Sequence, residues 1–252
     1  MEALAEAEVR EDGNKKGFRM KNLDKFVEKL KEHFGENLIS VIAFGSQANV
    51  ENVKNNLNLM IVTNELSAES LHAISKPVQN WVKAKNPVPV IMNKDEWYSS
   101  FDVYAIEYGD IKSNYRIIYG ADLVQDIRIN KPDLRLQCES ELKDLLLKYK
   151  VNFLMNIDSD REMKRFIDIV IKTILVIFRS ILRLHDKDVP YRAVDIVEHA
   201  SACVDFNKEV MIKLAKVKYE NDTLSKKELV YVESELFKDI QNLLKQVDRM
   251  YF

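Results

Sequence analysis

The stretch Ile39–Thr63, with the sequence ISVIAFGSQANVENVKNNLNLMIVT, decides the fold of this chain. It begins with an apolar run that ends at the dipeptide Gly45-Ser46. A polar loop follows, and then a second apolar run, which Asn56 and Asn58 precede and open. Because side chains alternate along a strand, residues two apart point to the same face. The stretch therefore predicts two strands, joined by a Gly-Ser turn and a polar loop, with two amide side chains where the second strand begins.

Helices and strands alternate around this stretch as far as about residue 126. The apolar spacing predicts helices over 22–34 and 67–85 and a short helix from Asn93, with strands over 38–44, 57–63, 88–92, 101–107 and 116–119. The second strand is apolar enough for the inside of a sheet. Pro89 favours either an edge position for the third strand or a place among its first residues. We expect Pro77 to kink the helix over 67–85 or to divide it in two.

After Pro132 only helical periodicity remains. The predicted helices cover 134–154, a segment opened by Ser159 and Glu162, 190–204 with Asp188 near its N-cap, 208–219, and a last helix opened by Ser225 and Glu228. The helix after Ser159 has only a narrow polar stripe, so it is expected at the centre of a bundle. In the last helix Leu229, Leu236, Leu243 and Met250 recur every seven positions, as in a bundle seam.

The sequence thus predicts an α+β fold in two parts. Residues 1–19 form an N-terminal extension, residues 20–128 a domain with a mixed sheet and flanking helices, and residues 129–252 an all-α helical bundle.

Composition limits the classes of partner. The 38 Lys and Arg residues nearly balance the 40 Asp and Glu residues, which leaves a net charge of −2 and no strong nucleic-acid signal. No apolar run is long enough to predict a membrane span. The two cysteines, Cys138 and Cys203, form no metal or disulfide pattern, so a cytoplasmic location is expected.

The order Phe44-Gly45-Ser46, polar loop and Asn56-Leu57-Asn58 resembles the signature of the polymerase-β-like nucleotidyltransferases. In that superfamily a strand ends at Gly-Ser, a loop usually containing Ala-Arg-Gly follows, and Asp-x-Asp opens the next strand. The resemblance covers residues 22–125. The helical remainder is similar in arrangement to the C-terminal bundles of small bacterial members, such as the antibiotic nucleotidyltransferases.

The resemblance implies a particular chemistry. Nucleotidyl transfer is an in-line displacement at the α-phosphorus, and two Mg²⁺ ions neutralise the charge that develops on the phosphate oxygens. The two Asp residues and a third carboxylate on a nearby strand hold these ions, which prefer anionic oxygen ligands. The Gly-Ser turn, here Gly45 and Ser46, contacts the triphosphate of the nucleotide.

This chain departs from the pattern at its metal ligands. Asn56 and Asn58 stand where the two Asp residues belong, and Glu51 is the only acid between Gly45 and Val62. Glu107, in the strand predicted over 101–107, is the candidate for the third carboxylate, with Asp102 as a weaker candidate. One carboxylate does not hold two divalent ions, so no metal site is predicted, and Mg²⁺ is expected only if the chain is active.

Three functions remain open at this point. The first is a nucleotidyltransferase-like pseudoenzyme that retains ATP or GTP binding or a regulatory role. The second is an active nucleotidyltransferase that transfers NMP from an NTP to a small molecule or a protein, with Glu107 and an altered metal arrangement. The third is a structural module without a ligand, which forms a homodimer through its helical domain.

Overall fold

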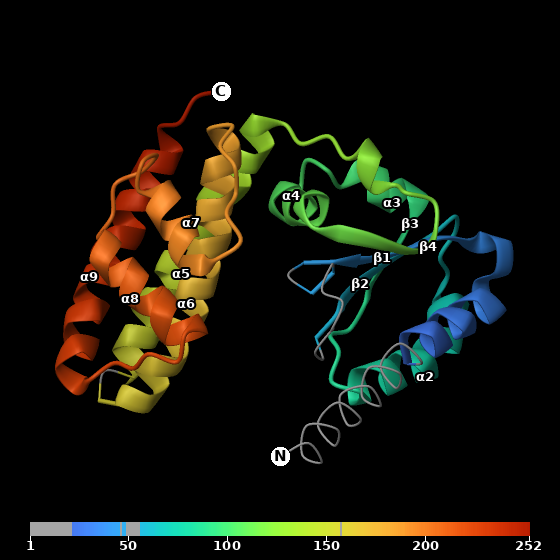
Figure 1. Cartoon of the computed structure of the whole chain (residues 1–252), viewed down its shortest axis with the longest axis horizontal. Helices are drawn as coiled ribbons and strands as arrows, with labels where there is room; N and C mark the ends of the chain where they lie inside the picture. The colour runs from blue at the N-terminus through green and yellow to red at the C-terminus, as the bar shows by residue number, and fades with distance from the viewer. Residues whose placement is uncertain (1–21, 46, 49–55, 157) are drawn as a thin grey trace, which may run out of the picture. The chain divides into compact units, whose positions relative to one another are not determined.

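The computed structural model describes residues 22–45, 47–48, 56–156 and 158–252 (Figure 1). The predicted extension 1–19, Ser46 and the loop 49–55 therefore lie outside the described residues. The chain divides into two compact units. One consists of Met1–Phe101 with Glu107–Arg128, and the other of Asp102–Ile106 with Ile129–Phe252.

The first unit, called the α/β unit below, is built on a sheet with the strand order β3-β2-β1-β4. Its strands are β1 (Leu38–Phe44), β2 (Asn58–Thr63), β3 (Val90–Asn93) and β4 (Tyr115–Gly120). β1 runs antiparallel to both β2 and β4, whereas β2 and β3 are parallel, so the sheet is mixed, as predicted. The inner position of β2 and the edge position of β3 are confirmed as well.

The helical segment 22–34 and α2 (Ala68–Lys83) cover one face of the sheet (Figure 1). Alternate residues of the two inner strands, among them Val41, Ala43, Leu59 and Ile61, are buried in the core on this face. Phe26 stacks on Trp81 with 5.0 Å between ring centroids, which joins the two helices over the sheet.

The opposite face carries α3 (Lys94–Ser99), α4 (Ala105–Ser113) and, further along, the 3-10 helix η2 (Val124–Asp126). Trp97 of α3 and Tyr108 of α4 are both buried, with ring centroids 4.9 Å apart. The Tyr108 hydroxyl donates a hydrogen bond of 2.9 Å to the Trp97 carbonyl. Its oxygen also lies 3.7 Å from the Met92 sulfur of β3, which places α4 over this face.

The strand predicted over 101–107 is wrong. Residues 101–107 do not form a strand but a turn followed by the first residues of α4. Ala105, Tyr108 and Ile111 are all buried, and their three-residue spacing suits one face of a helix. α2 continues through Pro77, so the helix is not divided there, and the kink that was the other expectation stays a prediction.

The second unit, called the helical unit below, contains α5 (Lys131–Asn156), α6 (Asp160–Leu184), α7 (Ala193–Ala200), α8 (Lys208–Tyr219) and α9 (Lys226–Asp248). α6 packs against all four of the other helices, so its predicted central place is confirmed. Leu229, Leu236 and Leu243 of α9 are buried in the same core. The predicted seam therefore packs inside the unit, and it is not available to a second chain.

The helix starts of the helical unit follow the sequence signals in part. Ser225 and Glu228 form the predicted reciprocal capping box at the start of α9. At α6, Ser159 accepts a hydrogen bond of 3.4 Å from the Glu162 amide. α7 begins later than predicted, at Ala193, and its N-cap residue is Arg192 rather than a residue near Asp188.

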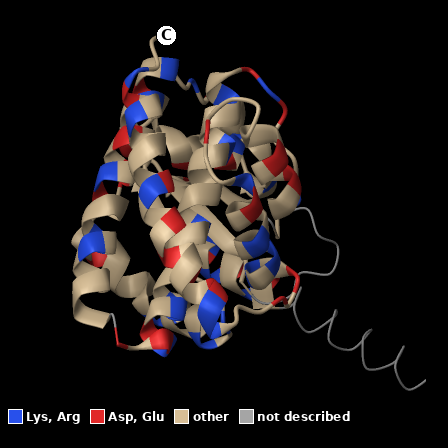
Figure 2. Cartoon of the chain, turned by 90° about the vertical axis from the view of Figure 1, so that its left-hand side faces the viewer, with Lys and Arg blue, Asp and Glu red and all other residues tan. Residues whose placement is uncertain are grey.

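The surface of the helical unit has mixed charge. Figure 2 shows Lys and Arg interspersed with Asp and Glu along the helices that face the viewer. Many of these charges pair along one helix, as Lys148 does with Asp144 at 2.5 Å. No helix in the described part of the chain is both long enough and apolar enough to span a membrane.

A buried carboxylate makes the stability of the helical unit dependent on pH. Asp239 of α9 is 6% exposed, and its Oδ1 accepts a hydrogen bond of 2.9 Å from the Asn207 amide. Its buried Oδ2 has no hydrogen-bond partner among the described residues. Burial disfavours the charged form and raises the pKa of Asp239, and the nearby Glu235 carboxylate acts in the same direction. Charged Asp239 therefore costs folding free energy at neutral pH.

Asp239→Asn is expected to raise the free energy of unfolding at pH 7 by about 1 kcal/mol, because it removes a charge that burial penalises. The gain should shrink as the pH falls and vanish below the ordinary aspartate pKa of about 3.9, where Asp239 is protonated in both the folded and the unfolded state. Urea unfolding followed by far-UV circular dichroism at pH 7 and pH 4 measures this difference.

Glu235→Gln on the same helix is the matched control. Hydrogen bonds from Lys238 and Asn207 lower the pKa of Glu235, so its loss should not stabilise the unit. A destabilised Asp239→Asn variant at pH 7 would contradict the assignment.

Candidate functional site

Three of the predicted site residues, Gly45, Asn56 and Asn58, lie at one end of the sheet. Phe44, the last residue of β1, pairs with Asn58 at the start of β2 and with Tyr115 at the start of β4. Because β3 runs parallel to β2, its first residue, Val90, lies toward the same edge. The end of β1 and the beginnings of the other three strands therefore meet there. We call this border of the sheet, which is formed by strand ends and not by an edge strand, the β1-end edge.

Gly45 leaves β1 in a conformation that favours glycine, with φ of +80°. Its N–H donates a hydrogen bond of 3.0 Å to the Asn114 carbonyl, and the Asn114 Nδ2 donates one of 2.7 Å back to the Gly45 carbonyl. The amide of Ala48 closes a turn by donating to the same carbonyl at 2.9 Å. A Cβ atom on Gly45 would lie 3.1 Å from Asn58 Nδ2. The structure therefore brings Gly45 and Asn58 together, as the sequence predicted.

The Gly45 N–H already donates to the Asn114 carbonyl, and a contact of Gly45 with a nucleotide stays a prediction. What Gly45 contributes is space, since it leaves the approach to Asn58 Nδ2 free of a side chain. Ser46, the other predicted nucleotide-binding residue, lies outside the described residues.

Asn56 enters β2 in a strained conformation. Its φ is +100°, a region that Asn tolerates better than most residues do. The amides of Asn56 and Leu57 lie 3.4 and 3.3 Å from Asn86 Oδ1, which accepts from both. The Asn86 Nδ2 in turn donates to the Trp81 carbonyl at the end of α2, at 3.4 Å. Asn86 was missed by sequence reasoning, and it holds the chain where β2 begins.

The two candidates for a third carboxylate, Glu107 and Asp102, do not lie on a strand of the sheet. Glu107 lies on α4 and not on a strand, because residues 101–107 do not pair with the sheet. Ser113, the last residue of α4, lies six residues further along, a rise of about 9 Å, and β4 begins two residues after that. Asp102 lies in the turn before α4, where its Oδ1 accepts a hydrogen bond of 2.9 Å from the Val103 amide. A role for Glu107 remains a prediction without the strand position on which it was based.

Val90 lies on the strand next to that of Asn58 and on the same face of the sheet. Val90 pairs in register with Met60, two residues after Asn58, so the side chains of Asn58 and Val90 lie on the same face of the sheet. The Val90 side chain is 41% exposed, and the sequence from Asn86 to Val90 contains no acid. This position could not be found without the parallel register of β2 and β3.

The side chains at the β1-end edge do not fit a pair of Mg²⁺ ions. Mg²⁺ is a hard cation that binds carboxylate oxygens. The polar residues placed here, within the part of the chain that the structure describes, are the neutral amides Asn56, Asn58, Asn86 and Asn114. Across the described residues, no group of three or more His, Cys, Asp or Glu side chains could hold a metal. What the edge offers instead is a set of neutral hydrogen-bond donors and acceptors.

No protein-family model and no curated protein matches this chain. Among solved structures, it is similar to the crystal structure of spectinomycin adenyltransferase AAD(9) from Enterococcus faecialis with ATP and spectinomycin. The TM-score is 0.55 and the sequence identity 14%, over 88% of this chain and 99% of that one. At this identity the likeness concerns the fold. The chain has a nucleotidyltransferase-like α+β fold with a helical C-terminal part.

Proposed function

We propose that this protein is a catalytically impaired member of the nucleotidyltransferase fold that binds a nucleotide, ATP or GTP, without transferring NMP efficiently. The observation that carries the proposal is the close approach of Gly45 to the Asn58 side chain. The approach to the site is kept open, while the position of a metal-binding carboxylate holds an amide.

The replacement of Asp by Asn changes how a triphosphate can bind. A carboxylate repels phosphate oxygens unless a cation lies between them, whereas the amide Nδ2 of Asn58 can donate a hydrogen bond to a phosphate oxygen directly. Asn56, exposed at the start of β2, adds a second neutral amide near the same edge. Binding through these groups needs no metal. The ATP in the similar adenyltransferase structure supports a nucleotide as the ligand class.

The same replacement explains the proposed loss of activity. In two-metal transfer the ions stabilise the attacking oxygen, the leaving oxygen and the charge on the phosphate. With Asn at 56 and 58 and Val at 90, these three positions supply no formal negative charge to hold such ions. Binding would then remain while the main stabilisation of the transition state is lost.

Gly45→Ala tests where the nucleotide binds. The new Cβ would lie 3.1 Å from Asn58 Nδ2 in a backbone conformation with φ of +80°, so it should displace this amide. We expect ATP affinity in EDTA to fall by about tenfold or more, the effect of one lost hydrogen bond to a charged group. Isothermal titration calorimetry measures the change.

Gly35→Ala is the matched control for this substitution. Gly35 also has a positive φ, of +53°, but a Cβ there would meet no atom within 4 Å. ATP affinity should stay unchanged. Equal losses in both variants would place the nucleotide elsewhere. No heat with either ATP or GTP in the unaltered chain would refute nucleotide binding and favour a structural module.

The location and assembly of the protein are also proposals. The two free thiols, Cys138 and Cys203, support a reducing compartment such as the cytoplasm. Burial raises the pKa of the Cys138 thiol to about 12, so this residue is an inert core group. A homodimer through the helical domain would have to use surfaces other than the α9 seam, which packs inside its own unit.

A further inference from the structure

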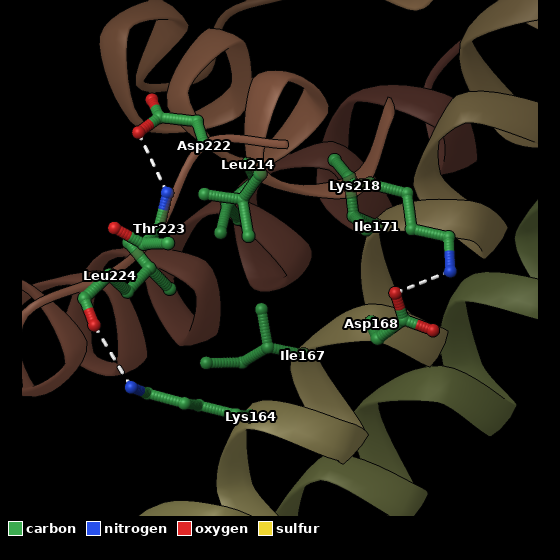
Figure 3. Close-up of a pocket in the computed structure, with 10 residues that line it drawn as sticks. Lys164, Ile167, Asp168, Ile171, Leu214, Lys218, Asp222, Thr223 and Leu224 are labelled. Atoms are coloured by element: carbon green, nitrogen blue, oxygen red, sulfur yellow. Dashed lines mark hydrogen bonds and ion pairs between the residues drawn. The ribbon is translucent and has the colours of Figure 1, made fainter. Parts of the chain in front are cut away.

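A cavity of about 220 Å³ opens into the helical unit between α6, α8 and the segment that joins α8 to α9 (Figure 3). Its interior is apolar. Ile167 and Ile171 of α6, Leu214 of α8 and Leu224 of the connecting segment line it, and each of them is at most 7% exposed. The cavity belongs to the helical unit alone, and the proposed nucleotide site does not use it.

Charged side chains surround this apolar interior, and both of its acids are neutralised. Figure 3 shows Lys218 joined to Asp168 on one side, with 2.5 Å between Nζ and Oδ1. Lys172 lies 3.3 Å from the other oxygen of Asp168. Asp222 has Lys213 at 3.0 Å. Neither acid is therefore left to attract a cationic ligand.

One cation of the rim remains without an acid. Lys164 donates a hydrogen bond of 2.9 Å to the Leu224 carbonyl, which Figure 3 also shows, and it forms no ion pair with any residue that the structure describes. An ammonium group has three donors, so this bond leaves two for another acceptor. Even when Glu228, 3.5 Å from Lys213, is included, the lysines of this group outnumber its carboxylates by one.

We propose that this cavity binds a small monocarboxylate with an apolar body, its carboxylate on Lys164 and its body between α6 and α8. The apolar walls select an uncharged body, and the spare cation at the rim selects one negative charge. Size narrows the class further. A buried apolar cavity of about 150 Å³ holds benzene, whereas pockets for drug-sized ligands begin at about 300 Å³. A cavity of about 220 Å³ therefore suits a single ring or a short branched chain with a carboxylate.

Three probes of the same shape test the charge preference: benzoate, benzyl alcohol and benzamidine, which are anionic, neutral and cationic. Binding is followed by methyl NMR of Ile167, Ile171 and Leu214, so that only ligands inside the cavity are counted. We expect benzoate to bind about tenfold more tightly than benzyl alcohol, the effect of one charge-assisted hydrogen bond, and benzamidine to bind least.

Lys164→Met keeps an apolar stem of similar length and removes the charge. Benzoate affinity should fall about tenfold, to the level of benzyl alcohol, whose own affinity should change less than twofold. Lys226→Met is the matched control. Lys226 is 82% exposed, lies near Asp160 at 3.7 Å, and is not part of the cavity lining. Its loss should leave benzoate affinity unchanged.

Three results would overturn the proposal. The first is the absence of any ligand-induced shift in the methyl groups of Ile167, Ile171 and Leu214 with all three probes. The second is benzamidine binding as tightly as benzoate. The third is benzoate affinity that falls equally in Lys164→Met and Lys226→Met. The second and third would each show that Lys164 does not select the charge.

Discussion

Incubated with ATP, Mg²⁺ and a panel of hydroxyl acceptors, the purified protein is expected to transfer AMP at least about 10⁴-fold more slowly than an ordinary enzyme. A typical kcat is about 10 s⁻¹, so the expected rate is below about 10⁻³ s⁻¹. The reason is the loss of formal charge at Asn56, Asn58 and Val90. Two metal ions each supply several kcal/mol of transition-state stabilisation, and each 1.4 kcal/mol or so corresponds to a factor of ten in rate. Transfer of α-labelled phosphate from ATP to an acceptor measures the rate.

A triple substitution tests whether restored carboxylates restore Mg²⁺ binding. It combines Asn56→Asp, Asn58→Asp and Val90→Glu. It places carboxylates just before β2, at its first residue and on the neighbouring parallel strand, and those at 58 and 90 lie on one face of the sheet. Asp tolerates the positive φ of position 56 about as well as Asn does. We expect Mg²⁺ to strengthen ATP binding by at least tenfold in this variant. Adding Glu107→Ala should leave that gain intact, because Glu107 lies on α4. A wild-type rate near 10 s⁻¹ that Glu107→Ala abolishes would instead establish an active transferase.

Gly120→Ala is expected to destabilise the α/β unit by about 4 kcal/mol or more, a loss large enough to unfold many domains. Gly120 ends β4 with φ of +78°, and a Cβ there would lie 1.9 Å from the Ile39 carbonyl oxygen. This contact is with backbone, so β4 and β1 would have to separate. The same carbonyl accepts a hydrogen bond of 3.0 Å from the Ala121 amide, which the separation would break.

Tryptophan fluorescence in urea measures this effect selectively, because both tryptophans, Trp81 and Trp97, lie in the α/β unit. Gly35→Ala again serves as the control, since its φ is positive but its surroundings are open. It should cost only about 1–2 kcal/mol, the price of a left-handed backbone for a residue other than glycine. Similar midpoints for the two variants would show that the close approach of Gly120 to β1 is not what sets the stability.

The strands around Gly45 could be predicted because their signals are local. The apolar runs, the Gly-Ser turn and the Asn pair all lie within one short stretch, and β1 matches its predicted bounds of 38–44. The central place of α6 followed from its narrow polar stripe. The prediction of a strand over 101–107 was wrong because the aromatic and β-branched residues of this segment favour a strand locally. The burial of Ala105, Tyr108 and Ile111 favours a helix instead.

The site was less predictable than the fold, because it depends on how the strands are paired. Gly45 and Asn58 could be placed together from their order along the chain. Val90 and Asn86 could not, because only the parallel register of β2 and β3 brings the start of β3 to this edge. The choice of Glu107 followed from a strand that does not exist. Because Glu107 lies on α4, no carboxylate that was predicted as a metal ligand lies on a described strand of the sheet.

The central claim is that the β1-end edge accommodates a nucleotide through neutral groups and without a metal. Its most direct test is the ratio of the ATP dissociation constants measured by calorimetry in EDTA and in excess Mg²⁺. We predict measurable ATP binding in EDTA and a ratio that differs from one by less than about threefold, because neutral amides gain little from a bridging cation. ATP binding that Mg²⁺ strengthens by tenfold or more in the unaltered chain would contradict the account.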